Sequence, residues 1–159
     1  MPAAGERLIR LTELGFTLPN PPQPLGQYTT VVRADSALLL SGMLPLDAGR
    51  AAVTGLLGEE RTVEDGRYAA RLAALNALAV AAHAAGGLDR VRRLLRATVF
   101  MTTTPTFTAH AMVADGASAL FAALFDEPHT RVAVGAYTLP LGATVVLDAT
   151  FELGDEARR

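Results

Sequence analysis

The stretch RVAVGAYTLPLGATVVLDATFEL, residues 131–153, decides the fold prediction for this chain. Two runs of β-branched and small apolar residues flank Leu-Pro-Leu-Gly at 139–142, a sequence typical of a tight turn between strands. The pattern predicts a core hairpin. Arg131 stands at the head of its first strand, and no other basic residue occurs from 132 to 153.

Arg131 is a candidate for binding an acidic ligand. Its guanidinium stays charged at working pH and can bind a carboxylate through two parallel hydrogen bonds. A structural salt bridge to an acid outside the strand, such as Asp126 or Glu127 in the preceding loop, is the alternative. The residues alone leave both interpretations open.

The remaining sequence predicts a short helix followed by the order β-β-α-β-α-β-β. The long helix that begins at Thr62 has a capping sequence, Thr62-Val63-Glu64-Asp65, and ends at Gly86-Gly87. The expected elements are an amphipathic helix over 4–14, a proline-rich connector over 18–26, strands over 29–33 and 37–42, a loop over 43–61, the helix to about Ala85, a strand over 94–102, a helix over 107–125 and the hairpin.

This order predicts an α+β fold, with a mixed β-sheet and the two long helices packed on one face. A single domain is expected over 1–159, with a short N-terminal helical extension over 3–15 and a core over about 22–153. Both faces of the strands carry apolar or small residues, so we expect a partner on the face opposite the helices. The long helix is rich in alanine, and either belongs to the core or presents part of its surface to another subunit.

The composition excludes several classes of protein. The 159 residues include no Cys and no Lys, and they carry a formal net charge of −2. We therefore expect no disulfides and a cytoplasmic location, no secretory signal or membrane span, and no nucleic-acid partner. His83, His110 and His129 are scattered, so no metal site is expected.

Several short motifs together resemble the Rid/YjgF family of reactive-intermediate imine and enamine deaminases, also called L-PSP endoribonucleases. The motifs are Gly26-Gln27-Tyr28, Leu40-Ser41-Gly42-Met43-Leu44-Pro45, Thr98-Val99-Phe100, Arg131 and Leu139-Pro140. The resemblance covers about 22–153. The N-terminal helix and the stretches at 115–118 and 131–135 resemble a longer, poorly characterised bacterial branch of the family.

The resemblance implies a chorismate-mutase-like fold and a homotrimer with clefts between its subunits, without a metal or organic cofactor. It implies that Arg131 grips the substrate carboxylate and that Tyr28 acts in the same cleft, so that both are catalytic. Ser41 and Gly42 would line this cleft, and backbone groups near Ala133 would help to hold the substrate. The implied substrates are short-lived 2-imino and 2-enamino acids, which yield 2-keto acids and ammonia.

One position departs from the family pattern. Many members carry a water-positioning glutamate six residues after the proline of Leu-Pro, where this chain has Val146. Valine neither orients water nor accepts a proton. Asp148 falls on the same strand face, but roughly 6–7 Å further along.

Two functions therefore stand beside each other. The first is an imine and enamine deaminase that depends on Arg131. The alternative is a non-catalytic, trimeric protein that binds small carboxylates in a regulatory role, which Val146 favours. A ribonuclease is disfavoured by the net negative charge and the absence of Lys, because phosphate neutralisation dominates RNA affinity.

Overall fold

A computed structural model describes residues 5–155 and confirms the α+β fold class. The sequence predicted most elements within a few residues. The elements are α1 (Glu6–Glu13), β1 (Val31–Ala34), β2 (Ala37–Leu40), β3 (Leu46–Asp47), β4 (Arg50–Ala51), α2 (Val63–Ala85), the 3-10 turn η1 (Leu88–Arg90), β5 (Val91–Thr102), α3 (His110–Phe125), β6 (Thr130–Ala136), the 3-10 turn η2 (Pro140–Gly142) and β7 (Val145–Leu153).

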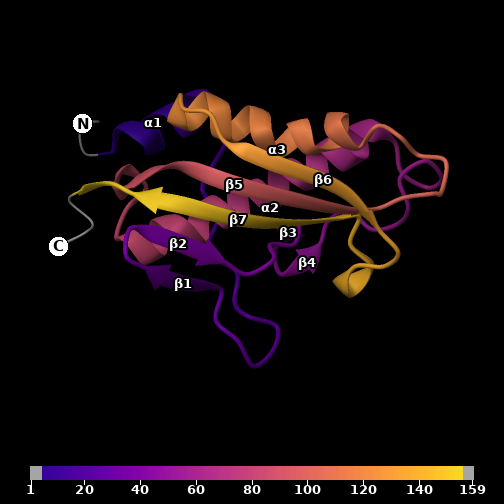
Figure 1. Ribbon diagram of the computed structural model, residues 1–159, viewed down its shortest axis with the longest axis horizontal. Coiled ribbons are helices and arrows are strands. Elements are labelled where there is room, and N and C mark those ends of the chain that lie inside the picture. The colour runs from indigo at the N-terminus through magenta and orange to yellow at the C-terminus, as the bar shows by residue number, and fades with distance from the viewer. Residues whose placement is uncertain (1–4, 156–159) are drawn as a thin grey trace.

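The main sheet has five strands in the order β1-β2-β7-β5-β6 (Figure 1). β6 runs parallel to β5, whereas the other neighbours are antiparallel. A parallel pair requires a crossover, and α3 supplies it between β5 and β6. The sheet is therefore mixed, as the sequence predicted.

The predicted hairpin over 131–153 is wrong. β6 and β7 do not pair, because β5 lies between them and pairs with both. The segment after η2 is held elsewhere: the amide of Thr144 donates to the carbonyl of Val53, and Thr54 forms a bridge with Ala143. The local pattern of two strands around a turn does not specify which strands pair, and here the long strand β5 separates them.

Both long helices lie on one face of the sheet. In Figure 1, α2 passes behind the strands and α3 lies along the β6 side. The burial of β7 alternates along its length, and its buried side chains belong to the core cluster that includes α2 and α3. The buried residues of β7 are Val145, Leu147, Ala149, Phe151 and Leu153.

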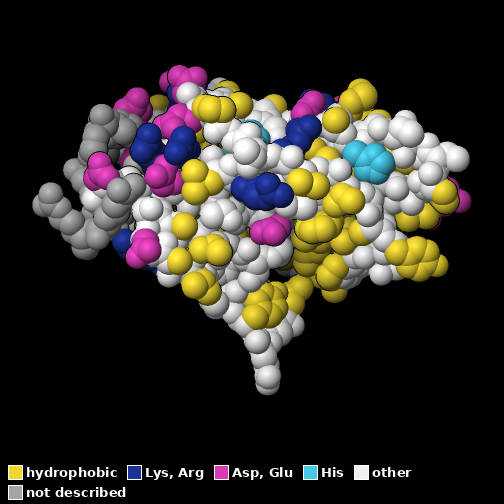
Figure 2. Space-filling view, viewed as in Figure 1, with side chains coloured by type: hydrophobic (Ala, Val, Ile, Leu, Met, Phe, Trp, Pro, Cys, Tyr) yellow, Lys and Arg dark blue, Asp and Glu magenta, His cyan; other side chains and the backbone are white. Residues whose placement is uncertain are grey.

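The other face of the sheet, which we call the open face, carries exposed apolar side chains. Val32, Leu39, Val132 and Val134 are each between 39% and 55% exposed. Residues paired across neighbouring strands point to the same face, and the register links these four with the half-buried Val146. Figure 2 shows hydrophobic side chains gathered over part of the surface in the same view.

The helix α2 begins and ends where the sequence predicted. The Thr62 hydroxyl accepts from the Asp65 amide at 3.2 Å, and the Asp65 carboxylate accepts from the Thr62 amide at 2.9 Å. Gly86 ends the helix in the left-handed conformation. Most of α2 is buried in the core, which supports the first of the two alternatives for its alanine-rich sequence.

The predicted loop over 43–61 contains a short hairpin, β3–β4, so this prediction was incomplete. Asn76 of α2, which is buried, fixes the entry to this hairpin. Its side-chain amide donates to the carbonyls of Leu44 at 3.0 Å and Leu46 at 3.1 Å. These strands have only two residues each and no alternating pattern, so sequence periodicity could not reveal them.

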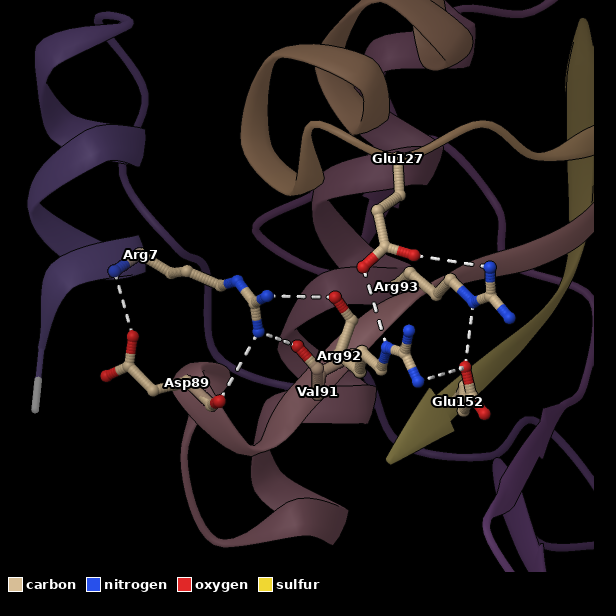
Figure 3. A network of polar contacts seen from close by, with 7 residues as sticks. All are labelled: Arg7, Asp89, Val91, Arg92, Arg93, Glu127 and Glu152. Carbon is tan, nitrogen blue, oxygen red and sulfur yellow. Dashed lines mark hydrogen bonds and ion pairs between the residues drawn. The ribbon is translucent and has the colours of Figure 1, made fainter. Parts of the chain in front are cut away.

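A polar network fastens α1 and the start of β5 (Figure 3). The amide of Arg7 donates to the Asp89 carboxylate at 2.9 Å, and its guanidinium donates to the carbonyls of Asp89, Val91 and Arg92. Beside it, Arg92 and Arg93 share two carboxylates, those of Glu127 and Glu152. Glu127 precedes β6, so this network also fixes the approach to that strand.

No helix among residues 5–155 is long and apolar enough to cross a membrane.

The contact between α2 and α3 depends on a missing side chain. A Cβ atom at Gly116 would overlap the backbone carbonyl of Arg67. Gly116→Ala is therefore expected to lower the free energy of unfolding by about 1–3 kcal/mol, even though Ala favours helix formation. Urea denaturation measures this change. Ala122→Ser, at an exposed position of α3, is the control and is expected to stay within about 0.5 kcal/mol of wild type. Equal stability of Gly116→Ala and wild type would contradict the close contact.

Candidate functional site

Arg131 lies on the helix side of the edge strand β6 and contacts α3. Its Nη1 donates to Asp115 Oδ1 at 2.6 Å and to Ser118 Oγ at 3.1 Å. The side chain of Arg131 is 23% exposed and that of Asp115 is 52% exposed. Asp115 and Ser118 are three residues apart on α3, so both present their side chains to the same neighbour.

The two acids named from the sequence as alternative partners of Arg131 are not its partners. Glu127 is 3.2 Å from Arg93 and 3.5 Å from Arg92. Asp126 ends α3 in a left-handed conformation. A structural salt bridge, the alternative considered for Arg131, does exist, but α3 supplies the carboxylate through Asp115, which is far more distant along the chain.

His129 extends this group of polar side chains. Its Nε2 lies 2.9 Å from Ser118 Oγ, and its ring packs edge-on against Phe121. Burial lowers the pKa of His129 from its usual value of 6.5, and the positive charge of Arg131 lowers it further. We call Asp115, Ser118, His129 and Arg131 the arginine cluster.

The other site residues expected from the sequence lie near β1 and β2. Tyr28 is 49% exposed, and its hydroxyl accepts from the Leu25 amide at 3.1 Å. The Ser41 hydroxyl donates to the Thr29 carbonyl at 2.7 Å. Gly42 lies against β7, since a Cβ there would be only 2.9 Å from Val146 Cγ1. We call Tyr28, Ser41, Gly42 and Val146 the β2 half-site.

Arg131 and Ala133 form a second group, the β6 half-site, on the edge strand β6. Ala133 pairs with Val99 and packs against the core. Two strands, β7 and β5, separate β2 from β6. At about 4.8 Å for each strand step, the backbones of β2 and β6 are about 14 Å apart. A single chain therefore does not bring Arg131 together with Tyr28, Ser41 and Gly42.

Comparison with known proteins identifies the family. The family described as "YjgF/chorismate mutase-like, putative endoribonuclease" matches residues 8–153. The chain belongs to this family, which is also called Rid. The resemblance expected from the sequence motifs is thereby confirmed, as is the chorismate-mutase-like fold.

Several relatives resemble this Rid protein over nearly their whole length. Protein TCP17 of Trypanosoma cruzi is 39% identical over 156 residues, which cover 96% of this chain and 98% of TCP17. Atu1372 of Agrobacterium tumefaciens, a protein of unknown function, is 38% identical with a TM-score of 0.86 over 93% of each chain. A Shewanella oneidensis protein described as a putative endoribonuclease is 32% identical, with a TM-score of 0.89 over 92% of this chain and 99% of that one.

Escherichia coli TdcF, solved with bound serine, shares the fold at a lower level of similarity. It is 22% identical to this Rid protein, with a TM-score of 0.64 over 85% of this chain and 94% of TdcF. At this identity the likeness establishes the fold alone.

Val146 lies on the open face of β7, where it pairs with Phe100. It brings no acid or base to the β2 half-site of this Rid protein. Asp148 is exposed on the same face and pairs with Thr98, as expected from the strand alternation. The nearest carboxylate further along this face is therefore displaced by two residues, or roughly 6–7 Å.

A separate groove of about 170 Å³ lies on the helix side, between the segment after α1 and the helices α2 and α3. Arg71 lies over the rings of Phe16 and Tyr68 at this groove, with centroid distances of 5.3 and 5.6 Å. Asp115 lines the groove as well as pairing with Arg131.

Within residues 5–155, no group of three or more His, Asp or Glu side chains is placed to hold a metal ion.

Sequence reasoning missed Asp115, Ser118 and His129 as neighbours of Arg131. The three-residue spacing of Asp115 and Ser118 on a predicted helix indicates a shared face, but it does not indicate which strand that face meets. The parallel pairing of β5 and β6 decides this, and the incorrect hairpin concealed it. Sequence spacing gives no sign of a partner for His129, because Ser118 is eleven residues away along the chain.

The lowered pKa of His129 predicts a specific dependence of stability on pH. The unfolded chain binds a proton at His129 more readily than the folded chain does, so folding is favoured above about pH 6.5 and this contribution is lost as pH falls below it. Between pH 7 and 5, wild type is expected to lose more unfolding free energy than His129→Gln, which cannot titrate. Urea denaturation at each pH measures the difference, and parallel pH profiles would contradict the burial of a neutral His129.

Proposed function

We propose that this Rid protein hydrolyses 2-imino and 2-enamino acids to 2-keto acids and ammonia, with Arg131 binding the substrate carboxylate. The observation that carries the proposal is the guanidinium of Arg131 itself, a half-buried cation fixed on the edge strand of a Rid fold. TdcF, a protein of the same fold, binds serine, which is also a small α-substituted carboxylate.

The proposed site lies between two copies of the chain. Two strands separate Tyr28, Ser41 and Gly42 from Arg131 within one chain, so a cleft that contains both groups needs the β6 edge of one subunit beside the β2 half-site of the next. We propose that three such contacts close into a ring, the homotrimer that the family resemblance implies. The exposed apolar residues of the open face, Val32, Leu39, Val132 and Val134, support burial of this face against neighbouring subunits.

The chemistry makes modest demands on the protein. Water adds to the carbon of the C=N bond, the nitrogen takes a proton, and collapse of the carbinolamine breaks the C–N bond and releases ammonia. Imines hydrolyse readily in water, so fixing the carboxylate and placing the carbon near a water molecule suffices for acceleration. Arg131 holds the carboxylate, while Tyr28 and Ser41 from the neighbouring subunit supply hydroxyl groups to the same cleft.

Val146 favours a second candidate function. Without the glutamate of many Rid proteins, the cleft retains a carboxylate-binding arginine but lacks a group that orients water. A trimer that binds 2-keto acids without turning over imines would have these residues. Both candidates bind a small carboxylate through Arg131. They differ in whether the protein accelerates imine hydrolysis.

A coupled assay separates the candidates. An amino-acid oxidase generates the imino acid in the presence of semicarbazide, which traps it, and formation of the free 2-keto acid is followed. Wild type is expected to outcompete the trap, and Arg131→Ala is expected to lose about tenfold or more of this activity, because a charge-assisted bidentate contact is removed. Arg10→Ala, which removes an exposed arginine from α1, away from the open face, is the matched control and is expected to behave as wild type.

The Val146→Glu variant completes the comparison. If wild type is inert and Val146→Glu gains activity, the protein binds carboxylates without catalysis and the second candidate holds. If Arg131→Ala retains the full activity of wild type, Arg131 does not bind the substrate and the proposed mechanism is wrong.

A further inference from the structure

The protein contacts of Arg131 engage one nitrogen of its guanidinium, Nη1, and leave the other two to a ligand. Both hydrogen bonds, to Asp115 Oδ1 and to Ser118 Oγ, come from Nη1. Nη1 carries two hydrogens, so these contacts use both. Across residues 5–155, no hydrogen bond or ion pair engages Nε or Nη2 of this side chain. Three of the five N–H donors of Arg131 are thus left for a ligand.

The free donors form the geometry that a carboxylate requires. Nε–H and one Nη2–H project in parallel from one edge of the planar guanidinium, and this edge binds the two oxygens of a carboxylate. A guanidinium attached to a flexible side chain loses rotational freedom on binding. Prior fixation of Nη1 by two protein groups removes part of that cost.

Arg131 determines the direction of its hydrogen bond with Ser118. A guanidinium only donates, so Ser118 Oγ must accept from Nη1. The Ser118 hydroxyl hydrogen is then available to His129 Nε2, which accepts it when the imidazole is neutral. In the tautomer that carries its proton on Nδ1, His129 orients the Ser118 hydroxyl so that a lone pair faces Arg131.

We infer that Asp115 and Ser118 are positioning residues that lock Nη1 of Arg131 and leave its Nε–Nη2 edge as the carboxylate-binding surface. The inference rests on the proposed function of Arg131 and specifies how that residue recognises its ligand. Asp115 places a negative charge beside Arg131, which by itself weakens anion binding. We expect the affinity gained from a fixed guanidinium to exceed this electrostatic cost. Asp115 contacts Nη1 and does not occupy the Nε–Nη2 edge that the ligand uses.

The test is equilibrium binding of pyruvate, with methyl pyruvate as the uncharged comparison. Calorimetry gives the Kd, and the arginine Nε–H signals of ¹⁵N-labelled protein report which guanidinium is contacted. Wild type is expected to bind pyruvate and not the ester, with a shifted Arg131 signal that is assigned by its absence from Arg131→Ala. Asp115→Ala and Ser118→Ala are each expected to raise the Kd about fivefold to tenfold, as for loss of one hydrogen bond to a charged group.

Conservative variants separate positioning from a general structural effect. Asp115→Asn keeps an oxygen that accepts from Nη1, and Ser118→Thr keeps the hydroxyl, so both are expected to restore much of the affinity. Glu59→Ala removes an exposed acid elsewhere and controls for net charge. Thermal melting verifies that each variant is folded.

The outcomes separate this inference from the proposed function. If Arg131→Ala abolishes binding but Asp115→Ala and Ser118→Ala bind pyruvate as well as or better than wild type, the positioning role is overturned and Arg131 retains its proposed function. If pyruvate binds equally to wild type and Arg131→Ala, or does not bind wild type at all, the carboxylate assignment fails and the inference fails with it.

Discussion

The pairing of β5 with two different neighbours is the constraint on which the rest of the structure depends. β5 runs parallel to β6 and antiparallel to β7, so the chain must cross over through α3 before it can form β6. This crossover brings Asp115 and Ser118 beside Arg131. It also moves β6 to the edge of the sheet, as far as possible from β1 (Figure 1).

The edge position of β6 has consequences for electrostatics and assembly. An arginine on a central strand would point into the core or into a crowded open face, whereas Arg131 remains partly exposed while α3 neutralises it through Asp115. The preceding turn is fixed independently, since Glu127 binds Arg92 and Arg93 at the start of β5 (Figure 3). Arg131 therefore does not compete with those arginines for Glu127, and within residues 5–155 its carboxylate partner comes from α3.

Much of the fold was predictable from local sequence. The capping box at Thr62 and Asp65, the glycine at position 86 and the β-branched run of β1 each specify their own conformation through short-range chemistry. The parallel pairing of β6 was not predictable in this way, because two strands joined by a proline-glycine turn have the same local pattern whether they pair with each other or with a third strand. The two-residue strands β3 and β4 were too short to produce a periodic signal.

For the candidate site, the sequence could name residues but not bring them together. The types and positions of Arg131, Tyr28, Ser41 and Gly42 followed from their resemblance to a family, but their arrangement depends on strand order. Once β5 and β7 stand between β2 and β6, Arg131 is separated from Tyr28, Ser41 and Gly42 within one chain. The partners of Arg131 were hidden for the same reason, since the face of α3 that meets β6 depends on the crossover and not on the spacing of Asp115 and Ser118.

The central claim is that a complete site requires two chains, and subunit mixing tests it most directly. Arg131→Ala disables the β6 half-site and Tyr28→Ala disables the β2 half-site. The two variants are unfolded together in equal amounts and refolded, and pyruvate binding is measured by calorimetry. The account predicts that each variant alone lacks intact sites, whereas the mixture recovers about a quarter of the wild-type number, as random assembly of a shared site requires. A mixture that forms hybrid oligomers but recovers no sites would contradict a site shared between chains.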